Sequence, residues 1–322
     1  MKAAVIYKNG KLPKYTDFPD PIVENDNHLL ISVKASAVKN LDKHIASGKH
    51  YSANATETAK VVGGDGVGIL EDGTRVYALG VTGMIAEKAI IDKNRLVKVP
   101  EGLDDCTASA LPNAVAGSAM ALRFRAGIQK GETVLINGAT GVTGKIAIQL
   151  AKYYGAKRVI ITGRNEQTLK SLLELGADEY VVLTQSDEDF INQLKEIHAN
   201  TPIDIIIDYL WGHSAELILK SLKGNGSFTN RTRFVSVGSL AGDTIQLSAE
   251  ILRSVDLQLF GSGFGSWTKA EMVQLIDEIL PEMFALAASK KLVIETVAID
   301  IKDIEKAWDI DVPGGKRLVV TI

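Results

Sequence analysis

The stretch that decides the fold is GETVLINGATGVTGKIAIQLAKYYG, residues 131–155. It opens with the apolar run 133–137, which follows turn residues and predicts a buried strand. Glycines stand at 138, 141 and 144, and the residues after them have the apolar spacing of a helix. A glycine-rich turn between a strand and a helix lets a pyrophosphate reach backbone N–H groups, and the helix N-terminus adds positive potential. The spacing is G-x-x-G-x-x-G, not the common G-x-G-x-x-G, so the flanking strand and helix are what indicate a dinucleotide-binding loop.

Strands and helices alternate from this stretch onward. Further strands are predicted at 158–162, 180–183, 203–209, 233–237 and 257–261. Helices are predicted at 166–175, 187–198 and 214–222. Such an alternation is typical of a doubly wound parallel sheet.

The first hundred residues follow another pattern, with short strands and frequent turns. Strands are predicted at 29–35, 75–79 and 88–91, and turns at 62–68 and 71–74. This pattern favours a small β-barrel. Pro112 is expected to break the helical segments that follow.

The last fifty residues look like a return to the N-terminal domain. A long helix is predicted at 269–289, a strand at 292–298, a short helix at 304–308 and a closing strand at 318–322. We therefore expect two domains, one made of residues 1–115 and 266–322 and the other of residues 116–265.

Composition excludes several classes of function. The net charge of −3 and the pI near 6.0 give no electrostatic footprint for nucleic acid or an anionic membrane. No apolar run approaches the roughly 20 residues of a membrane helix. Residues 1–7 look like a first strand and not like a leader, and Cys106 is the only cysteine, so we expect a cytoplasmic protein without disulfides. Cys106 itself is interpreted as a packed small residue and not as a nucleophile.

Several phrases in order along the chain resemble the medium-chain dehydrogenase/reductase superfamily, in its zinc-free quinone oxidoreductase branch. They are MKAAVIYKNG (1–10), SAVKNLDKHIASGKHY (36–51), GGDGVG (63–68), NGATGVTGKIAIQLAK (137–152), SVGSLAG (236–242) and FGSGFGS (260–266). The resemblance implies an α/β protein with two domains. One is a GroES-like β-barrel catalytic domain, and the other is a Rossmann domain with a doubly wound parallel sheet.

The chain departs from the zinc enzymes of that superfamily at the metal. Those enzymes hold the catalytic metal with a cysteine, a histidine and a second cysteine or carboxylate. By the resemblance, Lys39 stands at the first cysteine position and Gly64 at the histidine position. Asp65 remains, but one carboxylate does not make a tetrahedral zinc site. We therefore expect no metal, and we interpret Asp65 as a hydrogen-bonding hub.

The strand after the glycine loop indicates the type of cofactor. In NAD-binding folds an acid about 20 residues past the loop, at the end of this strand, holds the ribose 2′-OH. Here the strand ends in Thr162, Gly163, Arg164 and Asn165, without an acid. The guanidinium of Arg164 suits a 2′-phosphate. We therefore expect NADPH; the alternative interpretation of Arg164 is an ordinary solvated surface arginine.

The expected cofactor contacts come from the glycine loop, from the ends of the other strands and, by resemblance, from one C-terminal turn. They are Gly138, Ala139, Thr140, Gly141, Val142, Thr143, Gly144, Thr162, Gly163, Arg164, Asn165, Leu210, Trp211, Gly238, Ser239, Leu240, Gly263, Phe264 and Lys316. For Lys316 the alternative is a solvated turn lysine.

On the substrate side the resemblance points to residues 39–51. Lys39 and Asn40 replace the metal-binding neighbourhood, and a cation or amide there could hold a substrate oxygen as negative charge develops on it. His44 and His50 stand where quinone oxidoreductases often have tyrosines and could supply a proton near neutral pH, as could Tyr51. A lone histidine is more often structural.

Three functions stay open from the sequence. The first is an NADPH-dependent, zinc-free oxidoreductase that transfers hydride to quinones. The second is an NADPH-dependent reductase of enones or enals, which are activated alkenes. The third is a nucleotide-binding protein without significant catalysis. The strand at 257–261 would lie at the sheet edge, and relatives commonly dimerise there, so a homodimer is expected.

Overall fold

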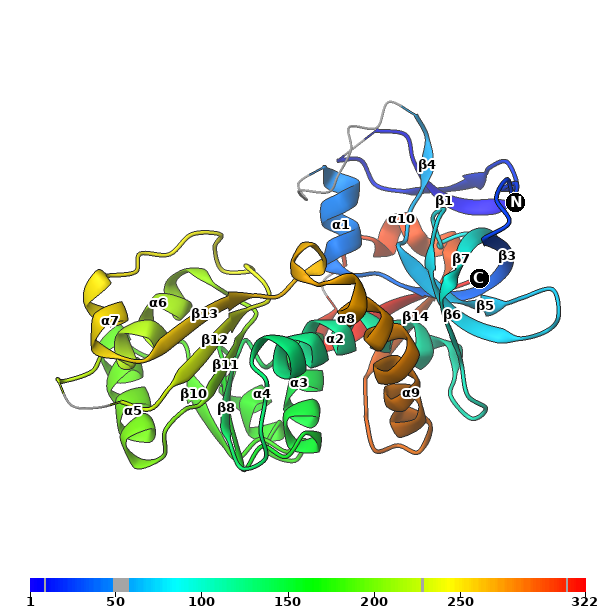
Figure 1. The fold of residues 1–322 in the computed structure, drawn as a ribbon. Coiled ribbons are helices and arrows are strands. Elements are labelled where there is room, and N and C mark those ends of the chain that lie inside the picture. Colours follow the sequence, from blue (N-terminus) through cyan, green and yellow to red (C-terminus); the bar gives the residue numbers. More distant parts are fainter. Residues whose placement is uncertain (9, 49–57, 227–228, 311) are drawn as a thin grey trace. The chain divides into compact units, whose positions relative to one another are not determined.

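The structure is a computed structural model that describes residues 1–8, 10–48, 58–226, 229–310 and 312–322 (Figure 1). The chain forms two compact units. One consists of Met1–Pro112 together with Val273–Ile322, and the other of Asn113–Met272. The N-terminal unit is therefore completed by the last part of the chain.

The second unit contains a six-stranded parallel sheet. Its strands are β8 (Thr133–Asn137), β9 (Arg158–Gly163), β10 (Glu179–Val182), β11 (Ile205–Asp208), β12 (Thr232–Ser236) and β13 (Leu257–Gly261). Their order is β10-β9-β8-β11-β12-β13, and every neighbouring pair is parallel. The chain thus runs outward from β8 in one direction and then resumes at β11 on the other side. This order confirms the predicted doubly wound sheet and places its topological switch point at β8 and β11.

Helices connect these strands and bury both faces of the central strand. They are α3 (Val142–Tyr153), α4 (Glu166–Ser171), α5 (Asp187–Asn200), α6 (Gly212–Ser221) and α7 (Ala249–Ser254). All five residues of β8 are buried, as expected for a strand covered on both sides. Phe190 and Leu194 of α5 pack with Leu135 of β8 in one hydrophobic cluster of this unit. The helix predicted at 166–175 is shorter than expected: it ends at Ser171, and turns follow as far as Gly176, whose φ is +115°.

The first unit contains the expected barrel. Strand β3 (His28–Ala37) pairs with both β5 (Asp65–Ile69) and β7 (Lys88–Lys98), and β6 (Arg75–Gly80) pairs with both of these, so the four strands close on themselves. A separate small sheet holds β1 (Lys2–Ile6), β2 (Lys14–Asp17) and β4 (Lys60–Val61).

The C-terminal strands belong to this unit, and the first of them begins at Thr296 and not at residue 292. Strand β15 (Arg317–Thr321) pairs with β3, and β14 (Thr296–Asp300) pairs with β15. The helical elements of the unit include α1 (Asn40–Ser47), α9 (Leu280–Ala288), α10 (Ile304–Ala307) and the 3₁₀ turns Ile301–Asp303 and Pro313–Gly315.

Two local predictions were wrong. Residues 62–68 were predicted as turns because of their glycines, yet from Asp65 onward the structure has strand β5. A Cβ at Gly66 would lie 2.8 Å from the carbonyl oxygen of Ala35, and one at Gly68 would lie 2.5 Å from that of Ser32. These glycines therefore allow a close approach of two strands and do not end one.

The second wrong prediction concerns Pro112. It lies inside helix α2 (Asp105–Met120), which continues into a π-helical turn, Ala121–Arg125. Proline has no backbone N–H, so the helix lacks one hydrogen bond at this position, but it does not end there. The helix predicted at 269–289 is confirmed as one run, composed of α8 (Lys269–Gln274), the π-helical turn Leu275–Ile279 and α9. In the part of the chain that the structure describes, no helix has the length and apolar character to span a membrane.

Candidate nucleotide site and buried ion cluster

The loop between β8 and α3 has the geometry of an anion cradle. Gly138 has a φ of +88°, a conformation that residues with a side chain rarely adopt. A Cβ at Gly144 would lie 2.6 Å from the Cα of Ala139, so only glycine permits this approach of helix and loop. Helix α3 begins after Gly141, and among the described residues no side chain caps it. The N–H groups of its first turn are thus available to an anion.

A buried polar network fixes the strand ends beside this loop. The Asn137 amide donates to Oδ1 of Asp208 at 2.7 Å and to the hydroxyl of Ser214 at 3.0 Å. Its carbonyl oxygen accepts a hydrogen bond from Thr162 at 2.6 Å. The backbone oxygen of Thr162 in turn accepts from the N–H of Ala139 at 3.0 Å. Strands β8, β9 and β11 are therefore joined through side chains that are completely buried at 137, 162 and 208.

Asp208 also holds the turn that follows β11. It accepts hydrogen bonds from the backbone N–H groups of Leu210 at 3.0 Å and of Trp211 at 3.0 and 3.1 Å. Burial raises the pKa of Asp208, and these donors and the Asn137 amide oppose that shift. Trp211 has a φ of +56°, which is a strained conformation for a bulky residue. The turn brings the side chain of Leu210 against Gly138, because a Cβ there would lie 2.9 Å from Leu210 Cγ.

The residues after β12 and β13, which were also predicted to contact the cofactor, lie at the same edge of the sheet. After β12, a Cβ at Gly238 would lie 2.8 Å from the carbonyl oxygen of Tyr209, and Ser239 and Leu240 follow on the surface. After β13, the N–H of Gly263 donates to the Ser266 hydroxyl at 3.0 Å, and Phe264 is half exposed. The carboxyl ends of parallel strands share one edge, so all the predicted contacts of this unit are gathered there.

The end of β9 bears directly on cofactor type. Gly163 lies close to the glycine loop, since a Cβ there would be 2.8 Å from Thr140 Cγ2. Arg164 is exposed, and within the described part of the chain its guanidinium has no ion-pair or hydrogen-bond partner. Asn165 caps α4 by accepting from the N–H of Thr168 at 2.9 Å. The first acid after the strand is Glu166, which forms an ion pair with Lys170 at 2.9 Å.

Glu166 also accepts a hydrogen bond from the Tyr180 hydroxyl at 3.2 Å. The hydrogen bond from Lys170, and then that from Tyr180, lower the pKa of Glu166. The carboxylate nearest to Arg164 in sequence is therefore already occupied by two partners. Sequence reasoning missed this arrangement, although the i,i+4 spacing of Glu166 and Lys170 was a signal for it.

In the first unit, Lys39 is the centre of a buried ion cluster. Its ammonium donates to the carbonyl oxygen of Ala37 at 3.0 Å and to Oδ1 of Asp65 at 2.5 Å, and it lies 3.0 Å from Oδ2 of Asp42. Its side chain is 3% exposed, so the three hydrogens meet protein oxygens and not water. Burial lowers the pKa of Lys39, but Asp42 and Asp65 outweigh burial and the pKa is raised. Lys39 therefore stays charged.

Two more buried groups belong to the cluster. The Tyr77 hydroxyl donates to Oδ2 of Asp65 at 2.8 Å, and burial, followed by Asp65, raises the pKa of Tyr77 well above its ordinary value. Arg317 is buried, and burial lowers its pKa while Asp42 and Asp65 oppose that effect. Asp65 is thus the hydrogen-bonding hub that the sequence suggested. The burial of Lys39 was not predicted, because its partners lie up to 26 positions away.

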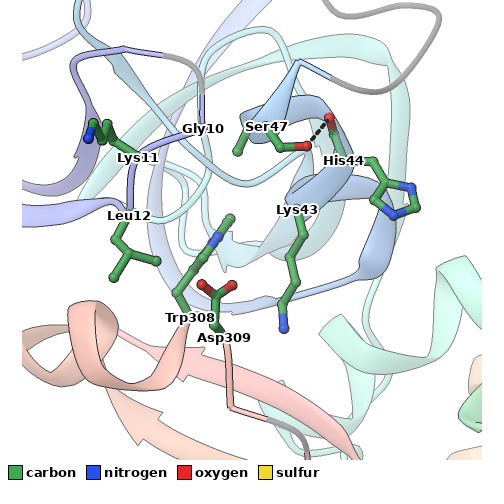
Figure 2. A pocket seen from close by; sticks show the side chains of 9 residues that line it. Gly10, Lys11, Leu12, Lys43, His44, Ser47, Trp308 and Asp309 are labelled. Atoms are coloured by element: carbon green, nitrogen blue, oxygen red, sulfur yellow. Dashed lines mark hydrogen bonds between the residues drawn. The ribbon is translucent and has the colours of Figure 1, made fainter.

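The other predicted substrate residues lie on or after α1. Asn40 is the first residue of that helix and is exposed, and His44 is exposed on its last turn. His50 and Tyr51 lie outside the described residues. Figure 2 shows His44 at the rim of a cavity of about 220 Å³, with its ring directed away from Trp308 and Asp309. The structure places Lys39, Asn40 and His44 on one short segment, but only Lys39 within the ion cluster.

Two further predicted residues lie in the first unit. Lys316 is partly exposed and lies 3.5 Å from a carboxylate oxygen of Glu295. Cys106 is partly buried against a cluster that includes Ala110 and Val319. Burial, then the neighbouring Asp104 and Asp105, raise the pKa of the Cys106 thiol. This environment supports the interpretation of Cys106 as a packing residue, because nucleophilic cysteines have lowered pKa values.

The ion cluster does not fit a zinc ion. Its oxygens already surround an ammonium, and it has no sulfur or imidazole donor, which zinc sites prefer. Over the residues that the structure describes, no group of three or more histidine, cysteine or acidic side chains could hold a metal.

Comparison with known proteins agrees with this geometry. A family model described as zinc-binding dehydrogenase matches residues 142–280. That match begins after Lys39 and Asp65, so it does not include the ion cluster. The human protein named quinone oxidoreductase is 29% identical over 287 residues, which cover 85% of this chain and 83% of the relative.

Two solved structures share the fold over the whole chain. The mycobacterial quinone oxidoreductase superposes with a TM-score of 0.83 at 19% identity, and each chain is covered completely. The quinone oxidoreductase from Thermus thermophilus, solved with and without NADPH, superposes with a TM-score of 0.79 at 24% identity, again with complete coverage of both. The closed barrel, the doubly wound sheet and these matches make the chain similar in fold and sequence to the quinone oxidoreductases of the medium-chain dehydrogenase/reductase superfamily.

Proposed function

We propose that this protein is an NADPH-dependent oxidoreductase that transfers hydride to a quinone without zinc. The observation that carries the proposal is the end of β9, where Arg164, exposed and unpaired among the described residues, stands in place of an acid beside the glycine cradle. The human and Thermus relatives bear the name quinone oxidoreductase, and the Thermus protein has been solved with NADPH. Both facts support the same cofactor and substrate class here.

The chain's own residues bind and orient the cofactor. The N–H groups of the first turn of α3 would receive the pyrophosphate, and Gly144 lets the helix approach the loop closely. Arg164 would pair with the 2′-phosphate, and the turn held by Asp208 keeps Leu210 beside the loop. When bound, NADPH supplies the hydride.

Asn40 and His44 are the described candidates for direct contact with the substrate. The Lys39 ammonium already has three oxygen acceptors, so a substrate oxygen would have to displace one of them. The side chains of Asn40 and His44 are exposed and have no partner among the described residues. A reduced quinone is a stabilised anion, so water suffices to protonate it and no strong acid–base pair is required.

Turnover with a panel of acceptors tests the proposal. We expect NADPH oxidation with 1,4-benzoquinone and little with a 2-alkenal or an alcohol. Turnover of the alkenal but not of the quinone would instead make the protein an enal reductase, which would share every cofactor residue. Tight NADPH binding without turnover of any acceptor would make it a nucleotide-binding protein. Metal analysis of the same active sample should show less than stoichiometric zinc.

A further inference from the structure

We propose that the Lys39 ammonium occupies a binding site for a monovalent cation, which we call the oxygen cage. Without the lysine side chain, the same oxygens would bind potassium or free ammonium. The inference rests on the proposed function in one respect, namely that the reaction needs no zinc. It explains how the chain neutralises the buried carboxylates of Asp42 and Asp65. It does not depend on which acceptor the enzyme reduces.

The cage consists of three oxygens directed at one point. They are the carbonyl oxygen of Ala37, Oδ2 of Asp42 and Oδ1 of Asp65, at 3.0, 3.0 and 2.5 Å from Nζ of Lys39. Ammonium and potassium are similar in size, and potassium accepts carbonyl and carboxylate oxygens in place of its hydration shell. Such all-oxygen donor sets suit hard cations and not zinc.

Other donors hold the two carboxylates in place independently of the ammonium. Oδ1 of Asp42 accepts from the N–H of Gly64 at 3.0 Å, and its Oδ2 accepts from the N–H of Lys39 at 2.9 Å. Oδ2 of Asp65 accepts from the Tyr77 hydroxyl at 2.8 Å. None of these bonds needs the lysine side chain. The two carboxylates therefore have hydrogen-bond donors that remain when the ammonium is removed, as in metal sites whose ligands are oriented by further hydrogen bonds.

The net charge of the cluster favours a monovalent cation at the position of the ammonium. Asp42 and Asp65 carry two negative charges, while Lys39 and the buried Arg317 carry two positive ones, so the cluster is neutral. Removing the ammonium leaves one uncompensated buried negative charge, which is costly. One potassium or ammonium ion restores neutrality, whereas a divalent ion would leave an excess positive charge.

The experiment is chemical rescue of Lys39→Ala, which keeps the backbone N–H and empties the cage. In tetramethylammonium chloride, whose cation is too large for the cage, we expect the midpoint of thermal unfolding to fall by about 10 °C. Replacement by potassium or ammonium chloride at equal ionic strength should recover most of that loss. The wild-type midpoint should not respond to this exchange of salts.

Two controls sharpen the test. Lys223→Ala removes an exposed ion pair with Glu250, and its midpoint should change little and show no preference among the cations. The double variant Lys39→Ala and Asp65→Asn also lacks the negative charge of one cage carboxylate. Potassium should therefore no longer raise its midpoint of thermal unfolding. If Lys39→Ala is insoluble, refolding from urea in each salt gives the same comparison through the yield of folded protein.

An equal loss of stability in all three salts would overturn the proposal and reduce Lys39 to an ordinary buried ion pair. Rescue by zinc alone would overturn it as well. The proposed function fails by different observations, namely zinc in the active wild type or absence of turnover, so the two failures are distinguishable.

Discussion

At the scale of single residues, two glycines of one loop have different tasks. Gly144 lets helix α3 lie close to the backbone at Gly138 and Ala139, where an added Cβ would be 2.6 Å from main-chain atoms. Gly141 has an ordinary φ of −78°, and an added Cβ would have only the Gly138 oxygen nearby, at 3.9 Å. The sequence shows two equivalent glycines, but the packing separates them.

This difference gives a first prediction. Gly144→Ala should lower the free energy of unfolding by about 1–3 kcal/mol, because backbone atoms have to move to admit the methyl group. Gly141→Ala is the matched control and should stay within about 1 kcal/mol of the wild type, since glycine at this position costs entropy and relieves no clash. Urea unfolding measures both variants. Equal losses in the two would contradict the assigned role of Gly144.

At the scale of elements, the start of α8 is joined to the π-helical turn after α2. Thr268 and Glu271 form a capping box: the Thr268 N–H donates to Glu271 at 2.7 Å, and the Glu271 N–H donates to the Thr268 hydroxyl at 3.2 Å. The same carboxylate accepts two hydrogen bonds from Arg125, at 2.8 and 2.9 Å. The Arg125 guanidinium is the main cause that lowers the pKa of Glu271 from 4.5 to about 2.

A second prediction concerns pH. The folded pKa of Glu271 is below its unfolded value, so its contribution to stability is present above pH 4.5 and is lost as pH falls to about 2. Arg125→Met should therefore weaken the acid dependence of the unfolding free energy in this window. Lys223→Met, which breaks an exposed pair with Glu250, should leave that dependence unchanged. Identical acid profiles for Arg125→Met and the wild type would show that the pair does not act on stability.

Local patterns predicted the elements well where one segment decides its own structure. The loop from β8 to α3 and the order of parallel strands follow from hydrophobic period and turn residues. Strand β5 was not predicted, because Gly66 and Gly68 allow close contact with strand β3, which is distant in sequence. The Lys39 cluster was missed for the same reason, since Asp65, Tyr77 and Arg317 reach it only through the fold. Long-range contacts leave no local pattern to read.

At the scale of the whole molecule, the open edge of the parallel sheet bears on assembly. Among the strands that the structure describes, β13 pairs only with β12, and Leu259 on it is 39% exposed. We predict a homodimer formed through this edge, in which Leu259→Lys should shift light scattering toward the mass of one chain while circular dichroism stays unchanged. A wild-type protein that is monomeric at tens of micromolar would contradict this prediction.

We propose that the carboxyl edge of this sheet binds NADPH and that Arg164 recognises its 2′-phosphate. The most direct measurement is the dissociation constants of NADPH and NADH for the wild type and for Arg164→Ala, by fluorescence titration at one salt concentration. We predict that the wild type prefers NADPH and that Arg164→Ala loses about tenfold or more of that preference, mainly through weaker NADPH binding, since a charge-assisted pair contributes about 1.5–3 kcal/mol. The same NADPH preference in both proteins, or tighter binding of NADH by the wild type, would contradict the account.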